Sequence, residues 1–336
     1  SHAVETIRHR VDLLGVAEPV IQPLGNDQID VQLPGLSESD KERARALIER
    51  AAFLERVVTI LEGRKEELAA ALTLDQGKPL GEAQGEVEEL IVYFKMAAAD
   101  ATRIEGLMPP SVDARKRVLV YRAPLGVVGV ITPWNWPYTM PAELIAPALA
   151  GGNAVVWNPA SSTSICAVRL AECLVEAGFP PGVVNLVTGS GAEVGDTIVE
   201  SPDVKVISFT GSSANGKRIA ERAGRRLKRL SLELGGKNPF VVCDDADLDH
   251  AVKWACLSAY SNAGQRCASG SRIIVTDAIY DSFRDKLVAA AKRLRVGTGD
   301  DDDLRARVDR LEVVGQPGLA PIRPFAKRFL HIDDDQ

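Results

Sequence analysis

The sequence contains little cysteine for its 336 residues. Its five cysteines are an odd number, and no two of them have the Cys-x-x-Cys spacing that is typical of zinc sites. The pattern therefore predicts neither a disulfide framework nor a metal site. Free thiols of this kind are typical of a reducing compartment, so the expected location is the cytoplasm.

Positive charge and long hydrophobic runs are also scarce. The formal net charge is -6, and the Lys/Arg cluster at residues 224–230 lies among apolar residues at helical spacing, so nucleic acid is not an expected partner. The two longest apolar stretches, residues 118–131 and 144–157, are interrupted before the roughly 20 residues that a membrane helix requires. The chain does not open with a signal-peptide pattern. We therefore expect no membrane partner.

Four units of a short apolar strand, a turn and a helix follow one another between residues 126 and 224. The strands and turns read GVVGVITPW, AVVWNPA, VVNLVTGS and VKVISFTGS. Such units predict parallel strands with crossover helices, so the expected fold class is α/β with a doubly wound, mostly parallel Rossmann-like sheet. Such sheets bind nucleotides at the carboxyl ends of their strands. Residues 56–104 have helical periodicity, and we expect their helices to cover the sheet.

The first 50 residues have a different pattern. It predicts a helix at residues 3–15, two strands at 19–25 and 28–35 around the turn GND, and a helix from Ser37. We therefore expect a small α+β segment before the main domain.

Two glycine-rich turns are candidates for phosphate binding. TGSGAEVG, at residues 188–195, follows a strand but is one residue too long for the dinucleotide fingerprint, and an ordinary turn fits it equally well. In SFTGSSANG, Gly211 and Ser212 stand at the start of a helix, where free N–H groups form an anion site. The alternative is an ordinary serine N-cap.

Two polar residues stand at strand ends. Glu233 ends an apolar strand before a Gly-Gly turn, where it is either a partly desolvated general base or half of an ion pair with Lys237. Asn135 lies in PWNWP, where two prolines make the turn rigid. Its side chain either forms a local Asx turn or donates to an oxyanion.

Cys267 lies among small and polar residues in NAGQRCASGS, directly after Arg266 and with no histidine within fifteen positions. A Cys–His protease is therefore the less favoured alternative for this cysteine. The other four cysteines lie in apolar surroundings and are expected to be small core residues: Cys166, Cys173, Cys243 and Cys256.

Between residues 54 and 299, the order and spacing of five segments resemble those of the NAD(P)-dependent aldehyde dehydrogenase superfamily. The segments are GVVGVITPWNWPYTMPAELIAPALAGGNAVV, GFPPGVVNLVTG, FTGS, LELGGKNPFVV and NAGQRCASGSRIIV. The resemblance implies oxidation of a small aldehyde to a carboxylic acid with NAD or NADP. Cys267 would be the nucleophile, Asn135 an oxyanion donor and Glu233 the base that activates water. Because a carboxylate base favours hydrolysis, a non-acylating enzyme is expected.

The same resemblance implies a cofactor site at the carboxyl ends of the strands. Its expected residues are Ile131, Thr132, Pro133, Trp134, Asn158, Ser161, Gly191, Phe209, Thr210, Gly211, Ser212, Leu234 and Gly235. Asn158 stands where the family usually has a lysine that binds the adenosine ribose, and Ser161 where members that prefer NAD often have glutamate. These two departures leave NAD and NADP equally possible.

Both ends of the chain depart from the family. Residues 1–50 resemble a fragment of the protein-export subunit SecD, and residues 301–336 match no pattern. We therefore expect four parts: 1–50, an NAD(P)-binding domain at 51–232 with a hairpin at 111–126, a partial catalytic domain at 233–300, and a tail.

Compared with the family, we expect the chain to be incomplete at its C-terminus. Its oxidation of the aldehyde is therefore expected to be impaired. The alternative is a catalytically inactive nucleotide-binding remnant. The family forms homo-oligomers through such a hairpin, but here it would lack its partner strand and leave an open edge.

Overall fold

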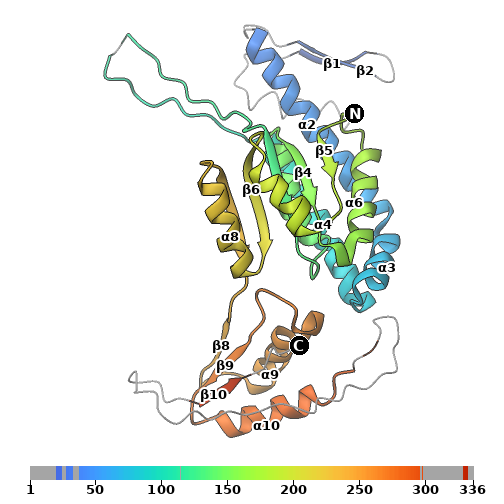
Figure 1. Ribbon diagram of the computed structural model, residues 1–336, viewed down its shortest axis with the longest axis vertical. Helices are drawn as coiled ribbons and strands as arrows, with labels where there is room; N and C mark the ends of the chain where they lie inside the picture. Colours follow the sequence, from blue (N-terminus) through green and yellow to red (C-terminus); the bar gives the residue numbers. More distant parts are fainter. Residues whose placement is uncertain are drawn as a thin grey trace.

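The structure is a computed structural model that describes residues 20–24, 28–32, 38–113, 115–295, 297 and 328–331 (Figure 1). The helix expected at residues 3–15 and most of the tail at 301–336 lie outside the described residues. None of the described helices has both the length and the apolar character needed to cross a membrane.

The N-terminal part begins with the predicted hairpin. β1 (Val20–Leu24) and β2 (Gln28–Gln32) pair antiparallel, which confirms the expected strand pair. Helix α2 (Glu38–Gly63) then runs without a break past residue 50, so the domain boundary expected there falls inside a helix. Helices α3 (Lys65–Gln76) and α4 (Leu80–Ala101) follow.

A parallel sheet forms the centre of the molecule and confirms the expected α/β class. Its order is β5-β4-β3-β6-β7. The strands are β3 (Val127–Ile131), β4 (Ala154–Asn158), β5 (Val184–Leu186), β6 (Val204–Gly211) and β7 (Arg229–Leu234). The chain adds strands to one side of β3 up to β5 and to the other side from β6. The carboxyl ends of β3 and β6 therefore meet at the point where the strand order reverses, the usual ligand site of such sheets.

Helices cover both faces of this sheet. α5 (Thr139–Ala150) and α6 (Ser164–Glu176) share one core with α2, α3 and α4, while α7 (Asp196–Glu200) and α8 (Ser213–Gly224) pack on the other face. Alternate residues of β3 pack into the two cores. Val128 and Val130 face the first core, and Val127 and Ile131 face the second. This alternation is the period-2 pattern of a strand that is buried on both faces.

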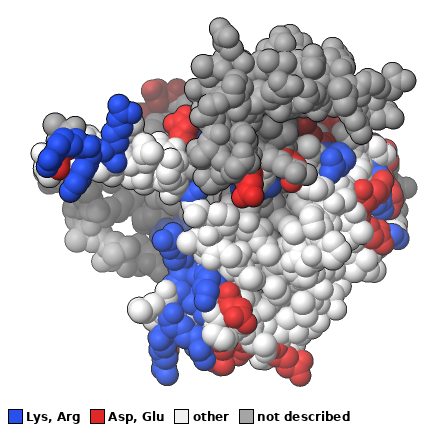
Figure 2. Space-filling view, turned by 90° about the horizontal axis from the view of Figure 1, so that it is seen from above, with Lys and Arg blue, Asp and Glu red and all other residues white. Residues whose placement is uncertain are grey.

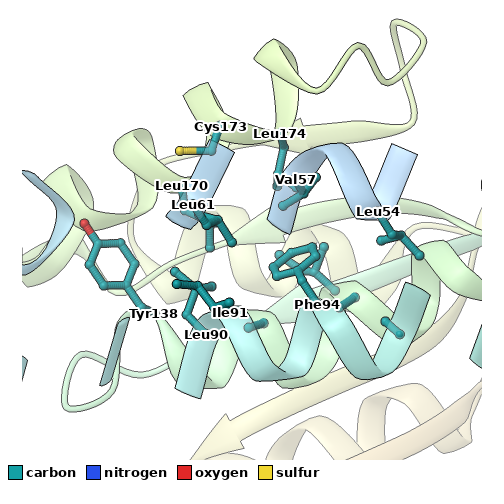
Figure 3. Packing of buried hydrophobic residues seen from close by; sticks show 14 of the residues in the cluster. Leu54, Val57, Leu61, Leu90, Ile91, Phe94, Tyr138, Leu170, Cys173 and Leu174 are labelled. Carbon is teal, nitrogen blue, oxygen red and sulfur yellow. The ribbon is translucent and has the colours of Figure 1, made fainter. Parts of the chain in front are cut away.

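The larger core is held by interlocking side chains from three helices (Figure 3). Phe94 points from α4 toward Val57 of α2 and Leu174 of α6, and all three side chains are fully buried. Burial of a side chain of this size stabilises the fold by about 1.5–3 kcal/mol. Cys166 and Cys173 of α6 are buried in the same core, as expected.

A second, smaller core follows β7. Its sheet has the order β10-β9-β8, with β8 (Pro239–Val242) parallel to β9 (Arg272–Val275) and β10 (Arg328–His331) antiparallel to β9. Helices α9 (Leu248–Tyr260) and α10 (Tyr280–Ala291) pack on it. The prediction that Cys243 is a core residue is wrong. It is exposed, because β8 ends at Val242 and the chain then leaves the sheet; Cys256 on α9 is half-buried.

The segment predicted as a hairpin at residues 111–126 is a projecting arm with little strand pairing (Figure 1). Its two sides meet in one antiparallel bridge, in which Leu107 and Val120 exchange backbone hydrogen bonds of 2.9 and 2.8 Å. Four Lys or Arg residues lie between positions 115 and 122, and Figure 2 shows this charge at the end of the arm. The hydrophobic residues beside them, such as Leu119 and Tyr121, are exposed.

Candidate active site

Asn135 lies in the turn between β3 and α5 and reaches a distant part of the chain. Its side-chain Nδ2 donates a 2.7 Å hydrogen bond to the carbonyl of Gln265, two residues before Cys267. The Asn135 side chain therefore joins two segments that are 130 residues apart in the sequence, rather than bonding within its own turn. An amide group has two N–H donors, so this bond leaves one for an oxyanion.

The loop before Cys267 has an unusual backbone. Asn262 and Ala263 have φ of 52° and 55°, and Gly264 has φ of 77°, so three successive residues adopt the left-handed region. That region is unfavourable for most residues with a side chain and persists where the surroundings hold it. Asn262 supplies this hold: it is buried, and its Nδ2 donates 2.8 Å to the carbonyl of Asn135 and 3.3 Å to that of Gln265.

Cys267 is exposed at the end of this loop. Its carbonyl accepts a 2.6 Å hydrogen bond from Nδ2 of Asn238. This bond fixes the backbone at Cys267, whereas Asn135 holds it two residues earlier, at Gln265. The neighbouring Arg266 guanidinium lies 5.5 Å from the ring centre of Trp136, and its Nη1 donates 2.6 Å to Ser261 Oγ.

The buried cysteines offer a contrast. Burial raises the pKa of Cys173 to about 11, and burial together with the nearby charge of Asp75 raises that of Cys166 further. Neither thiol can therefore ionise readily or meet a substrate, which leaves Cys267 as the better placed nucleophile of the three.

Glu233 lies near the end of β7, three residues before Gly236. The turn that follows passes Cys267 closely: a Cβ placed on Gly236 would be 4.0 Å from the Cys267 carbonyl oxygen. Glu233 itself is exposed, so its carboxylate does not have the partly desolvated surroundings that were considered for a general base. Half-buried Glu143 of α5 is a neighbour, since burial and then the charge of Glu233 raise the pKa of its carboxyl.

Most residues expected to bind a cofactor gather at the carboxyl edge of the sheet. After β3, Thr132 is buried and accepts a 2.9 Å hydrogen bond from Trp157 Nε1, whereas Trp134 is 43% exposed. Ile131 and Pro133 are half-buried beside them. These four residues, from half-buried Ile131 to exposed Trp134, form a rim at the end of β3.

The end of β6 forms the second part of this edge. Phe209 and Thr210 are buried, and the Thr210 hydroxyl has no hydrogen-bond partner among the described residues. A Cβ on Gly211 would lie 2.5 Å from the Phe209 ring, so only glycine fits. Ser212 caps α8 by accepting a 3.3 Å hydrogen bond from the Asn215 N–H, as in the N-cap alternative. An unpartnered hydroxyl beside a helix N-terminus and a glycine cradle fits a dinucleotide phosphate.

Asn158 occupies a structural position. It is 2% exposed, and its Nδ2 donates to the carbonyls of Val187 and Gly189 at 3.0 and 3.2 Å. Both N–H donors therefore hold the loop after β5, where Gly191 begins the turn Gly191–Gly195, and only the Oδ1 is left for a ligand. Ser161 is exposed nearby.

On β7, the half-buried Leu234 lies so close to α8 that a Cβ on Gly216 would be 2.5 Å from its Cδ2. The carbonyl of exposed Gly235 accepts a 3.4 Å hydrogen bond from Ser213 Oγ. Among the residues that the structure describes, no cluster of three His, Cys, Asp or Glu side chains could hold a metal ion.

The constellation of Asn135, Cys267 and the parallel sheet agrees with a family comparison. A family model described as "Aldehyde dehydrogenase family" matches residues 37–306. The chain belongs to the aldehyde dehydrogenase family. A second model, for the N-terminal part of the P1 domain of protein translocase subunit SecDF, matches residues 1–58, which agrees with the resemblance seen in the sequence. The two matches overlap inside the continuous helix α2.

Other family members are similar over much of the chain. Succinate-semialdehyde dehydrogenase [NADP(+)] GabD of Escherichia coli is 43% identical over 260 residues, which are 77% of this chain and 54% of that protein. The 3-sulfolactaldehyde dehydrogenase of Pseudomonas putida is 40% identical over 293 residues, 83% of this chain and 60% of that protein. The chain thus spans about half the length of the curated relatives it matches.

Solved structures of the family have the same fold. The succinate-semialdehyde dehydrogenase from Burkholderia pseudomallei has a TM-score of 0.75 and 42% identity, with 77% of this chain and 54% of that chain covered. An NADP-dependent enzyme of E. coli has a TM-score of 0.75 and 39% identity, with 86% of this chain and 63% of that chain covered.

The sequence interpretation missed three residues of this family member's site: Lys78, Glu86 and Asn262. Lys78 contacts the turn of Asn135 from 57 residues away, and Asn262 contacts it from 127 residues away. Spacing alone carries no signal for such contacts. Lys78 and Glu86 stand among other charged and polar residues in the sequence, so their pairing has no distinctive signal there.

Proposed function

We propose that the chain carries the cofactor-binding part and the nucleophile of an NAD(P)-dependent aldehyde dehydrogenase, which oxidises a small aldehyde to a carboxylic acid. One observation carries the proposal within this family. The side chain of Asn135 donates to a carbonyl two residues before Cys267, so a hydrogen-bond donor is fixed to the loop that carries an accessible thiol.

In the proposed reaction, the thiolate of Cys267 attacks the aldehyde carbon. Negative charge then develops on the carbonyl oxygen, and the free N–H of the Asn135 amide donates to it. Because the amide is already held by its bond to Gln265, it needs little reorganisation when the charge appears.

NAD or NADP would supply the acceptor for the hydride of the aldehyde. The residues that would hold it are the rim after β3, Gly211 and Ser212 at the start of α8, and the unpartnered Thr210 hydroxyl. Neither Asn158 nor Ser161 carries a charge that would discriminate a 2′-phosphate from a hydroxyl. Both cofactors therefore remain in the proposal; among the relatives, GabD is named for NADP(+), and the PnpE structure holds nicotinamide adenine dinucleotide.

Glu233 would complete the cycle by accepting a proton from the water that releases the acyl group from Cys267 as a carboxylic acid. Its position at the end of β7 and its exposure to solvent give water access to it. The same exposure supports a second candidate function, a non-catalytic nucleotide-binding protein, because an exposed carboxylate is not held near a substrate.

Two assays on one preparation separate these functions. NAD(P) binding is measured by quenching of tryptophan fluorescence, and turnover by aldehyde-dependent formation of NAD(P)H, with Cys267→Ala as the control. The proposal requires both binding and turnover, with turnover lost in the variant. Binding without turnover identifies the second function, and turnover that survives Cys267→Ala contradicts the assigned nucleophile.

A further inference from the structure

Two buried charges lie beneath the turn of Asn135. Lys78, in the connection between α3 and α4, forms an ion pair with Glu86 of α4, and both side chains are completely inaccessible to solvent. Removing two charges from water is costly, and such pairs are often no more stabilising than apolar residues of the same size. Fold stability alone is therefore a weak explanation for this pair.

The contacts of the pair point to the turn instead. Lys78 Nζ donates 3.2 Å to the backbone carbonyl of Asn135 and lies 3.8 Å from the ring centre of Trp136. The lysine thus touches the residue that carries the oxyanion donor and the residue that follows it. A buried ammonium over an aromatic ring adds a cation–π attraction to the hydrogen bond.

Glu86 holds the other end of the same turn. Its Oε1 accepts hydrogen bonds of 2.9 and 3.2 Å from the backbone N–H groups of Tyr138 and Thr139, where α5 begins. A carboxylate at this place satisfies free donors of the helix start and interacts favourably with the helix dipole. The ion pair therefore fixes the turn from residue 135 to residue 139 at both ends.

The same segment also contacts the loop of Cys267. Gln76 Nε2 donates 3.2 Å to Asn262 Oδ1, and Glu82 Oε2 accepts 2.8 Å from the Asn262 N–H. Asn262 in turn donates to the Asn135 carbonyl, which therefore receives hydrogen bonds from Lys78 and from Asn262. Residues 76–86 thus set the position of the Asn135 turn relative to the nucleophile loop.

We propose that Lys78 and Glu86 are positioning residues for the oxyanion donor: their buried ion pair holds the Asn135 amide in register with the loop of Cys267. The inference rests on the proposed function, in which Asn135 donates to the oxyanion. It adds a role for two residues that themselves touch neither substrate nor nucleophile.

The test uses an activated ester, p-nitrophenyl acetate, on the full chain without cofactor. Thiolate attack on the ester carbonyl forms the S–C bond, the oxygen takes up the negative charge, and p-nitrophenolate leaves as the acyl–oxygen bond breaks. The reaction therefore needs the thiol and the oxyanion donor but no hydride acceptor. The rate assigned to Cys267 is the part that Cys267→Ala removes.

Lys78→Met removes the charge and keeps a side chain of similar length. We expect it to slow acylation about tenfold or more, because a misplaced donor loses much of the 10²–10³-fold effect of such a group. In an Asn135→Ala background, the same substitution should slow acylation by no more than about twofold, because the donor that it positions is already gone. A loss of stability alone would act equally in both backgrounds.

Two further variants keep the test decisive. Lys65→Met is the matched control, because Lys65 of α3 forms an ion pair with Glu88 of α4 in which both side chains reach solvent. Its acylation rate should match that of the unchanged chain. If Lys78→Met does not fold, Lys78→Met/Glu86→Leu takes its place, since removing both charges leaves no unpaired charge buried.

The outcomes divide clearly. An equal slowing with and without the Asn135 amide overturns the inference, and so does failure of the ester to acylate Cys267 in the unchanged chain. If acylation follows the expected pattern but no aldehyde-dependent NAD(P)H forms, the proposed function fails while the positioning role stands. If NAD(P)H forms but the two substitutions act independently, only the positioning role fails.

Discussion

Asn262 is the residue on which the loop of Cys267 depends, and Asn262→Ala measures that dependence. The side chain donates to the carbonyls of Asn135 and Gln265 and accepts from Gln76, three hydrogen bonds of 2.8, 3.3 and 3.2 Å. Each contributes about 1 kcal/mol on average. Alanine is in addition about 1 kcal/mol less favourable than asparagine in the left-handed region. We therefore expect the free energy of unfolding to fall by about 3–4 kcal/mol.

Ala263→Gly is the matched variant, and we expect it to raise the free energy of unfolding rather than lower it. Ala263 has almost the same backbone conformation, with φ of 55°, but its side chain is exposed. Glycine relieves about 1–2 kcal/mol of strain there and loses up to about 1 kcal/mol through the greater freedom of the unfolded chain. A net stabilisation of about 0.5–1 kcal/mol is expected.

Urea denaturation followed by tryptophan fluorescence measures both changes, since Trp136 lies in the turn that Asn262 contacts through the carbonyl of Asn135. The reasoning is refuted if Asn262→Ala lowers the free energy of unfolding by less than 1 kcal/mol, or if both variants change it in the same direction. The first result would mean that the loop is held by other contacts, and the second that its left-handed backbone carries no strain.

Three further predictions concern the surroundings of the site. Ser212→Ala removes the N-cap of α8, so the free energy of unfolding should fall by about 1 kcal/mol and NAD(P) should bind more weakly in fluorescence titrations; unchanged affinity would exclude Ser212 from the phosphate site. Iodoacetamide should alkylate Cys267 within the time that leaves buried Cys166 unmodified, as peptide mass spectrometry can show. Because burial and Glu233 raise the pKa of Glu143, its ionisation opposes folding as the pH rises; Glu143→Gln should therefore raise the urea midpoint more at pH 7 than at pH 4, and an equal shift at both values would contradict this.

Much of the fold could be predicted because its signals are local. Each strand of the central sheet is a short apolar run followed by a helical pattern, and this repetition leaves few alternatives to a parallel sheet. The projecting arm at residues 111–126 shows the limit of that reasoning. Its apolar residues suit a strand, but pairing needs a partner, and the described part of the arm has one bridge, from Val120 to Leu107.

Cys243 and the boundary near residue 50 show two other limits. The apolar run before Cys243 correctly indicates strand β8, but it does not tell that the strand ends at Val242 and that the next residue faces solvent. The change of sequence pattern expected near residue 50 falls where two family models overlap, at residues 37–58. It does not interrupt the backbone, since helix propensity continues through α2.

The candidate site divides in the same way. Asn135, Glu233 and Cys267 stand at strand ends or in turns of unusual composition, where the sequence itself draws attention to them. Lys78 lies in the connection between α3 and α4 and Glu86 within helix α4, and their importance arises only from contacts with a turn more than fifty residues away. Tertiary contacts of this kind leave no trace in periodicity or composition.

The identity of the nucleophile is tested most directly by trapping the acyl group. The unchanged chain is mixed with an aldehyde and NAD or NADP, quenched in acid, digested and examined by mass spectrometry. We predict the acyl mass on the peptide that contains Cys267 and none on that of the exposed Cys243, which serves as the internal control. An acyl group on another cysteine, or NAD(P)H formation with no acylated cysteine, would contradict the account.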